Sequence, residues 1–161
     1  MIGLYRAVSN AAYDDISQSA GIGAPSKNTL GFGCAFLDVN LDGFLDLAVA
    51  NGHIDETVRN IRGNVGYAQP PHLFLNNGNG KFRDVATEVA GGFDKPKVGR
   101  GLACGDFDRD GDLDILMTTN NGPAYPFRND VASGNHGIRV PIIGTKSNPD
   151  ALAPTGRICD S

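Results

Sequence analysis

Two short stretches of the chain hold acidic side chains at a spacing that suits a hard divalent cation. The clearer stretch, residues 106–114 (loop 2), reads DFDRDGDLD and has carboxylates at relative positions 1, 3, 5 and 9, with glycine at position 6. Such crowded carboxylates repel one another unless a cation lies among them, and calcium takes about six to eight oxygen ligands. The glycine permits the sharp turn that gathers positions 1, 3 and 5 around one point. We therefore predict a calcium site whose ligands are the side chains of Asp106, Asp108, Asp110 and Asp114 and the backbone carbonyl of Asp112.

The same pattern occurs 68 residues earlier, in residues 38–46 (loop 1), which read DVNLDGFLD. Tight polar turns rich in Asp, Asn and Gly are the plain alternative for a single copy. Two copies with every ligand position filled favour calcium instead, so two ions are expected. The predicted ligands of loop 1 are the side chains of Asp38, Asn40, Asp42 and Asp46 and the backbone carbonyl of Phe44.

Neither loop belongs to a helix–loop–helix calcium site. Such a site needs a bidentate glutamate at position 12, where this chain has Val49 in one copy and Met117 in the other. Short apolar runs without helical periodicity follow both loops, and these runs predict strands. Each ion is therefore expected in a turn between two strands.

Composition limits the class of protein. The 161 residues can form one ordinary domain, and the 22 glycines suit a chain of many short strands and tight turns. The net charge of −4 argues against a nucleic-acid partner, and no apolar run is long enough to span a bilayer. The three cysteines lack CxxC spacing, so neither zinc nor a disulfide framework is indicated. We expect Cys34 and Cys104 to be small buried hydrophobes.

The chain divides into repeats. Residues 1–22 parallel the end of the segment 31–90, which is a complete repeat, and residues 99–130 repeat its beginning. Residues 135–161 depart from the pattern and form the start of a different module. Four antiparallel strands in a repeat of this length match a propeller blade. The predicted strands cover residues 31–38, 44–50, 72–76 and 81–86 in the complete repeat, then 100–106 and 112–119 in the next.

The unit LDVNLDGFLDLAVANG, paired with GDFDRDGDLDILMTTNNG, resembles the FG-GAP/VCBS repeats of calcium-binding β-propellers. The segment LFLNNGNGKFRDV is similar to the outer hairpin of those repeats, and the tail NHGIRVPIIGTKSNPDA resembles the opening of the ASPIC/UnbV module of cartilage-acidic-protein-like chains. The resemblance implies an all-β fold: a partial β-propeller of four-stranded antiparallel blades with calcium loops, plus a short C-terminal β segment. A propeller closes with about four or more blades. The chain is thus expected to be a fragment, with Met1 an internal start and further blades elsewhere.

The other groups of polar residues are weaker candidates for a metal or catalytic site. His53 with Asp55 and Glu56 could form a second metal or acid–base cluster, but an ordinary polar loop is favoured, and His72 and His136 look isolated. No catalytic motif is recognised, so a non-enzymatic module is expected, extracellular, cell-surface or periplasmic, that binds a protein or a glycan. The alternative is the scaffold propeller of a secreted polysaccharide lyase or hydrolase whose catalytic part lies outside this chain.

The polar insertion at residues 53–71 generates a first prediction. Loops of this length inside a compact repeat are usually functional or disordered, so we expect the insertion to be the most mobile segment and a partner contact. Limited trypsin digestion should cut first near Arg59 or Arg62. First cuts within the predicted strands would contradict the prediction.

Overall fold

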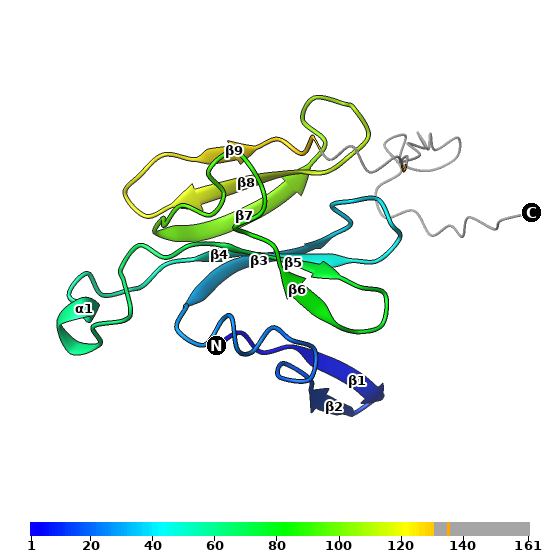
Figure 1. Cartoon of the computed structure of the whole chain (residues 1–161), viewed down its shortest axis with the longest axis horizontal. Coiled ribbons are helices and arrows are strands. Elements are labelled where there is room, and N and C mark those ends of the chain that lie inside the picture. Colours follow the sequence, from blue (N-terminus) through cyan, green and yellow to red (C-terminus); the bar gives the residue numbers. More distant parts are fainter. Residues whose placement is uncertain (131–134, 136–161) are drawn as a thin grey trace, which may run out of the picture.

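The computed structural model describes residues 1–130 and 135, and this part of the chain is built almost entirely of antiparallel β-structure (Figure 1). Its elements form a two-stranded hairpin, a four-stranded sheet and a three-stranded sheet. The expected all-β fold is therefore confirmed. The elements are β1 (Tyr5–Ser9), β2 (Ala12–Asp15), β3 (Gly31–Leu37), β4 (Asp46–Asn51), α1 (Val58–Ile61), β5 (His72–Asn76), β6 (Phe82–Asp84), β7 (Gly99–Gly105), β8 (Asp114–Thr119) and β9 (Tyr125–Phe127).

The four-stranded sheet is an antiparallel meander in the order β3-β4-β5-β6. Its second strand, β4, is buried along its whole length, since both faces of the sheet are covered there. The turn between β5 and β6 follows from the Asn-Gly pairs, because Gly78 and Gly80 have φ of 75° and 77°, which glycine adopts without strain. This up-and-down order is that of a propeller blade.

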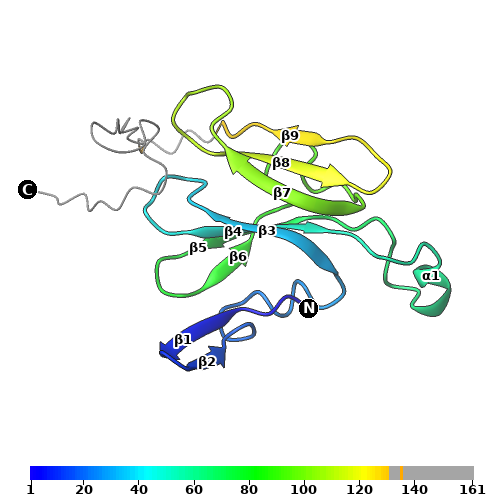
Figure 2. The ribbon, with the colours of Figure 1, turned by 180° about the vertical axis from the view of Figure 1, so that it is seen from behind.

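The three groups of strands lie in layers (Figures 1 and 2). The β1–β2 hairpin lies on one side of the four-stranded sheet, and the three-stranded sheet β7-β8-β9 lies on the other. Two clusters of buried side chains correspond to these contacts. One contains Ile22, Leu47, Val49 and Phe74, with Ile2 and Leu4 of the N-terminal segment packed against it.

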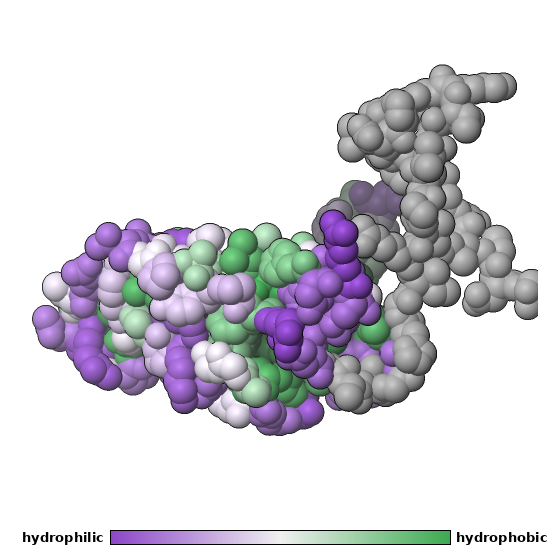
Figure 3. Space-filling view, turned by 90° about the horizontal axis from the view of Figure 1, so that it is seen from above, coloured by the Kyte–Doolittle hydropathy of each residue, from purple (hydrophilic) through white to green (hydrophobic). Residues whose placement is uncertain are grey.

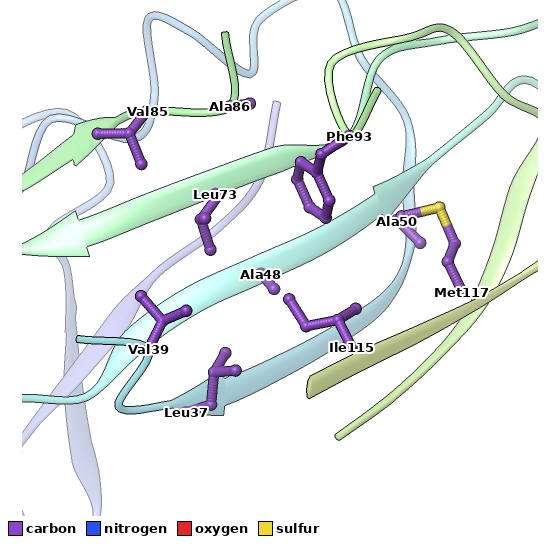
Figure 4. Close-up of a cluster of buried hydrophobic side chains, with 10 residues drawn as sticks. All are labelled: Leu37, Val39, Ala48, Ala50, Leu73, Val85, Ala86, Phe93, Ile115 and Met117. Atoms are coloured by element: carbon purple, nitrogen blue, oxygen red, sulfur yellow. The ribbon is translucent and has the colours of Figure 1, made fainter. Parts of the chain in front are cut away.

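The larger cluster joins the four-stranded sheet to the three-stranded sheet (Figure 4). Ala48, Ala50 and Leu73 of the first sheet meet Ile115 and Met117 of β8, and Phe93 closes the cluster from the connecting segment. Successive side chains of a strand point to opposite faces, so β4 sends Leu47 and Val49 to one layer and Ala48 and Ala50 to the other.

Strands β3 and β7 approach each other too closely for side chains at one point. A Cβ atom added to Gly33 would lie 2.6 Å from the backbone nitrogen of Leu102 and 2.8 Å from the carbonyl carbon of Gly101. Likewise, a Cβ atom on Gly99 would lie 2.7 Å from the carbonyl oxygen of Asn51. Glycine at these positions is what allows the two sheets to pack at this distance.

The insertion between β4 and β5 is partly ordered by backbone and side-chain packing. It contains the short helix α1, and Val58 and Val65 are buried within it, while Ile54 and Ile61 are exposed by 73% and 77%. The amide of His53 donates to the carbonyl of Tyr67 (2.8 Å), which closes the base of the insertion. Residues Arg59 and Arg62 are exposed.

Several expectations need correction. The predicted strands 44–50 and 112–119 begin only at Asp46 and Asp114, because the residues before them form the turns of loop 1 and loop 2. Strand 81–86 shortens to Phe82–Asp84, beyond which the amide of Ala86 bonds the side chain of Asp84 instead of a neighbouring strand. Cys34 is exposed rather than buried, because it shares the face of β3 on which Phe36 is also exposed.

Apolar side chains also reach the surface elsewhere. Figure 3 looks from above, the side of β9 in Figure 1, and shows apolar residues between hydrophilic ones on this face. Among residues 1–130 and 135, no helix has the length and apolar character needed to cross a membrane.

The contact between β3 and β7 yields a prediction. Gly33→Ala should lower the free energy of unfolding by about 1–3 kcal/mol, because the methyl group must displace the backbone of the neighbouring strand. Gly63→Ala is the matched control, since a Cβ atom there meets nothing within 4 Å. Calorimetric melting of both variants tests this. Equal melting temperatures for the two would show that the sheets do not depend on the close approach.

Candidate metal centres

Loop 1 is a closed turn held by its own side chains. The two carboxylate oxygens of Asp38 accept hydrogen bonds from the amides of Asp42 (3.0 Å) and Gly43 (2.8 Å). The side-chain oxygen of Asn40 also accepts from the amide of Asp42 (3.2 Å), and Asp42 Oδ1 accepts from the amide of Phe44 (2.9 Å). Gly43, at φ of 87°, allows the chain to reverse. The predicted ligand positions 1, 3 and 5 therefore point inward and are bonded to the backbone of the turn.

Loop 2 has fewer hydrogen bonds between its side chains and its backbone than loop 1, and its carboxylates lie closer together. Asp108 Oδ1 accepts from the amide of Asp110 (3.3 Å), and Asp110 Oδ1 accepts from the amide of Asp112 (3.2 Å). Oxygen atoms of Asp106, Asp108 and Asp114 all lie within 4.8 Å of one another, close enough to ligate one ion. Arg109 takes a left-handed conformation at φ of 68°, and Gly111 follows at φ of 103°.

The aspartate at position 9 of each loop is buried and serves as a fixed point. Asp46 accepts hydrogen bonds from the amides of Val39 (3.0 Å) and Asn76 (2.8 Å), while Asp114 accepts from those of Phe107 (2.8 Å) and Asn129 (2.8 Å). Each carboxylate thus ties the start of its own loop to the end of the third strand of its own sheet. The two sites are built alike.

Crowding perturbs the acidity of these groups. Burial raises the pKa of Asp46, and in loop 2 burial followed by the charge of Asp110 raises the pKa of Asp108. The pKa of Asp112 rises to about 6, again through burial and then through Asp110. The amide of Asp112 lowers the pKa of Asp110 in turn. Several carboxylates in loop 2 are therefore harder to ionise until a cation joins them.

Two atoms test whether loop 2 suits a cation. Among the described residues, Asp106 Oδ1 and Asp112 Oδ1 are buried oxygens of this loop that lack a hydrogen-bond donor. A buried acceptor without a partner is unfavourable, and an ion among these oxygens removes that cost. The hard oxygen donors of loop 2 fit calcium by their chemistry.

The structure places the sequence-predicted ligands unequally. It brings Asp106, Asp108 and Asp114 together, whereas Asp110 and Asp112 lie outside this convergent group. One side-chain oxygen of Asp112, the residue whose backbone carbonyl is a predicted ligand, is buried. Within the described residues, the carboxylates of loop 1 do not form such a convergent group. The ligand sets of both loops stay predictions.

The residues that sequence reasoning missed are Asn76 and Asn129, whose amides fix Asp46 and Asp114. Phe74 of β5 and Phe127 of β9 occupy equivalent positions in the two sheets. Phe74 pairs with Leu47 and Phe127 pairs with Ile115, and each of these partners directly follows the position-9 aspartate of its loop. Counting two residues on from each phenylalanine leads to the two asparagines.

A groove of about 610 Å³ opens beside the two loops. Its walls include Leu73, Val85, Phe93 and Ile115 of the larger core cluster, and Asn40 and Asn129 also line it. The groove is thus the outer edge of the apolar contact between the two sheets.

His72 is not isolated, contrary to expectation. Its Nδ1 lies 2.6 Å from Asp84 Oδ2 on β6, and its Nε2 lies 3.0 Å from the hydroxyl of Thr29, which belongs to the segment between β2 and β3. The Thr29 hydroxyl donates in turn to the carbonyl of Ser26 (3.2 Å). His72 is only 5% exposed. These contacts fasten the connecting segment to the sheet, which is a structural role.

His53 likewise serves its own loop, since its Nδ1 accepts from the amide of Asp55 (3.0 Å) and Asp55 accepts from the amide of Thr57 (2.8 Å). The polar-loop interpretation of this segment agrees with these bonds. His136 lies outside the described residues.

Part of this chain matches a known repeat family. Residues 50–117 match the family model described as FG-GAP-like repeat, a range that contains loop 2 and excludes loop 1. The resemblance to these repeats is therefore confirmed.

Among curated proteins, the chain is 50% identical over 54 residues to cartilage acidic protein 1 of Mus musculus and 48% identical over 54 residues to that of Homo sapiens. The matched segment is 34% of this chain and 8% of each of those proteins. Residues 136–161, where the ASPIC/UnbV resemblance falls, lie outside the described residues, and that module stays a prediction.

The His72–Asp84 pair carries a pH prediction. Burial alone would raise the pKa of Asp84, but hydrogen bonds from His72 and the amide of Ala86 lower it overall. A carboxylate with a depressed pKa stabilises the fold above its unfolded pKa of about 3.9 and loses that effect as the pH falls through the folded value. At pH 6, Asp84→Asn should cost about 1–3 kcal/mol of stability.

The difference in free energy of unfolding between the wild type and Asp84→Asn should shrink below about pH 4. Denaturant unfolding in EDTA from pH 6 to pH 3 measures it, with the exposed Glu56→Gln as control. A difference that stays constant over this range would contradict the assigned role of Asp84.

Proposed function

We propose that this chain is a calcium-stabilised segment of a β-propeller that binds a protein or glycan partner outside the cytosol. The observation that carries the calcium assignment is the convergence of Asp106, Asp108 and Asp114 beside two buried carboxylate oxygens without donors. A cation there would neutralise the three convergent carboxylates and give the donor-less oxygen of Asp106 a partner. The match to FG-GAP-like repeats supports a non-catalytic repeat module.

The order of strands in the three sheets supports a division into blades. In this proposal the segment 31–90 is one blade, 99–130 is most of a second, and 1–22 is the outer hairpin of a blade before them. Phe36, exposed by 52%, and the exposed Cys34 share one face of β3. Inner strands of a further blade in the parent protein would cover them, as stacked repeats require.

Each ion would act mainly as a structural support. In loop 2 the ligands are Asp106, Asp108, Asp110, Asp114 and the carbonyl of Asp112, and in loop 1 the corresponding positions are Asp38, Asn40, Asp42, Asp46 and the carbonyl of Phe44. A bound cation neutralises the carboxylates and fixes the turn. The protein's own residues then hold the ends of the flanking strands in register.

The calcium affinity expected of the two loops supports a location outside the cytosol. Neither loop has a bidentate glutamate, so dissociation constants of about 10⁻⁵ to 10⁻³ M are expected. Sites this weak fill at the millimolar calcium found outside cells, where such modules work. At about 1 mM calcium, a site with a dissociation constant of about 10 μM stabilises the folded state by about 2.7 kcal/mol.

The two loops are expected to differ in strength. Loop 2 offers four carboxylate ligands, whereas loop 1 has the neutral Asn40 at position 3, and affinity rises with ligand charge. In loop 1 both oxygens of Asp38 are also engaged by backbone amides, so an ion must compete with these bonds. Loop 2 should therefore bind calcium more tightly.

Matched asparagine variants test the assignment. Asp110→Asn and Asp42→Asn occupy position 5 of their loops, and each keeps the oxygen that accepts a turn amide while removing one charge. Asp110→Asn should weaken calcium binding at loop 2 about tenfold. The variant should melt at a lower temperature in calcium and at an unchanged or higher temperature in EDTA, where less repulsion remains. Asp42→Asn should have a smaller effect.

Isothermal titration with calcium and calorimetric melting measure both effects. The absence of calcium binding in the wild-type protein would overturn the proposal. Equal affinities for the two loops would overturn only their ranking.

A further inference from the structure

The two candidate calcium loops are joined by a continuous path of buried hydrogen bonds. Asn129 donates its backbone amide to Asp114 Oδ1 (2.8 Å) and its side-chain amide to the carbonyl of Val39 (2.7 Å). Val39 lies at position 2 of loop 1, and its own amide donates to Asp46 Oδ2 (3.0 Å). One residue of the second repeat thus links the position-9 aspartates of both loops.

The burial of this path makes its bonds consequential. Asp46 and Asp114 are 0% and 1% exposed, and Asn129 is 8% exposed. Hydrogen bonds in such surroundings are electrostatically stronger than in water, and a broken one leaves a buried polar group unpaired. The two halves of Asn129 have different tasks, since its backbone amide stays within its own repeat and its side-chain amide reaches the neighbouring one.

The corresponding residue of the first repeat bonds within its own loop instead. Asn76 donates its backbone amide to Asp46 Oδ1 (2.8 Å), as Asn129 does to Asp114, but its side-chain amide donates to the carbonyl of Leu45 (3.1 Å). The protein therefore offers two equivalent asparagines, one whose side-chain amide stays within a loop and one whose side-chain amide crosses between loops.

We propose that Asn129 is a positioning residue that couples the two loops, so that calcium bound at one raises calcium affinity at the other. The proposal rests on the calcium sites proposed above. An ion in loop 2 fixes Asp114 and, through it, the backbone of Asn129. The side-chain amide of Asn129 then holds the carbonyl of Val39, which adjoins the ligand Asn40. The amide of Val39, next to the ligand Asp38, is held in turn by Asp46. By linkage, an ion in loop 1 favours loop 2 by the same factor.

The first experiment is a thermodynamic cycle. Loop 2 is disabled by combining Asp108→Asn with Asp110→Asn, and titration calorimetry measures the calcium affinity of loop 1 both with Asn129 present and in the Asn129→Ala background. With Asn129 present, disabling loop 2 should weaken loop 1 about fivefold or more. In the Asn129→Ala background, disabling loop 2 should leave the affinity of loop 1 unchanged. Asn76→Ala is the control and should keep the coupling of the wild type.

The second experiment measures the coupling at loop 1 while no ion is bound there. Loop 1 is disabled by Asp42→Asn with Asn40→Ala, and hydrogen exchange of the Val39 amide is followed by nuclear magnetic resonance. Calcium added to loop 2 should slow this exchange in the protein that retains Asn129 and leave it unchanged in Asn129→Ala. If the alanine variant does not fold, Asn129→Leu keeps a similar side-chain size without the donor.

The outcomes separate this inference from the proposed function. Calcium binding at both loops with independent affinities, or coupling that survives Asn129→Ala, overturns the inference and leaves the calcium sites standing. A wild-type protein that binds no calcium at either loop overturns both.

Discussion

The structure depends on two carboxylates that are removed from water at the ends of loops 1 and 2. Asp46 and Asp114 each accept a hydrogen bond from a backbone amide at the start of their loop and another from an amide at the end of the third strand of their sheet (Asn76) or just past it (Asn129). A buried carboxylate is expensive unless its oxygens are satisfied, so these bonds determine where the loop closes and where the third strand ends. The strand pairing, the turn and the direction of the remaining acidic side chains follow from these two anchors.

The second constraint is steric. Gly33 and Gly99 leave space for backbone against backbone, and this brings the sheets close enough for Ala48, Ala50 and Met117 to share one cluster. The carboxylate anchors and the glycine contact act at different places in the same two sheets. Together they fix both the spacing of the sheets and the register of the loops, which explains why an asparagine of one repeat can reach a carbonyl of the other.

The repeated acidic spacing is enough to predict the loops, the strands that flank them and the all-β class. Hydrophobic runs such as 47–50 locate strands well because both faces are buried. The sequence cannot show that Cys34 is exposed, because exposure depends on which neighbouring layer covers the strand. It also cannot show the pairing of His72 with Asp84 and Thr29, which are distant in the chain and are joined only by the fold.

The position of the insertion relative to the loops has a consequence for how such a protein can change. Strand β4 begins at loop 1 and ends at the insertion, so the two lie at opposite ends of a strand that is buried throughout. Substitutions in the exposed insertion, at Ile54 or Ile61 for instance, therefore leave the end of the repeat that carries loop 1 intact. The surface of the insertion can change at one edge of the sheet while selection on folding acts at the other.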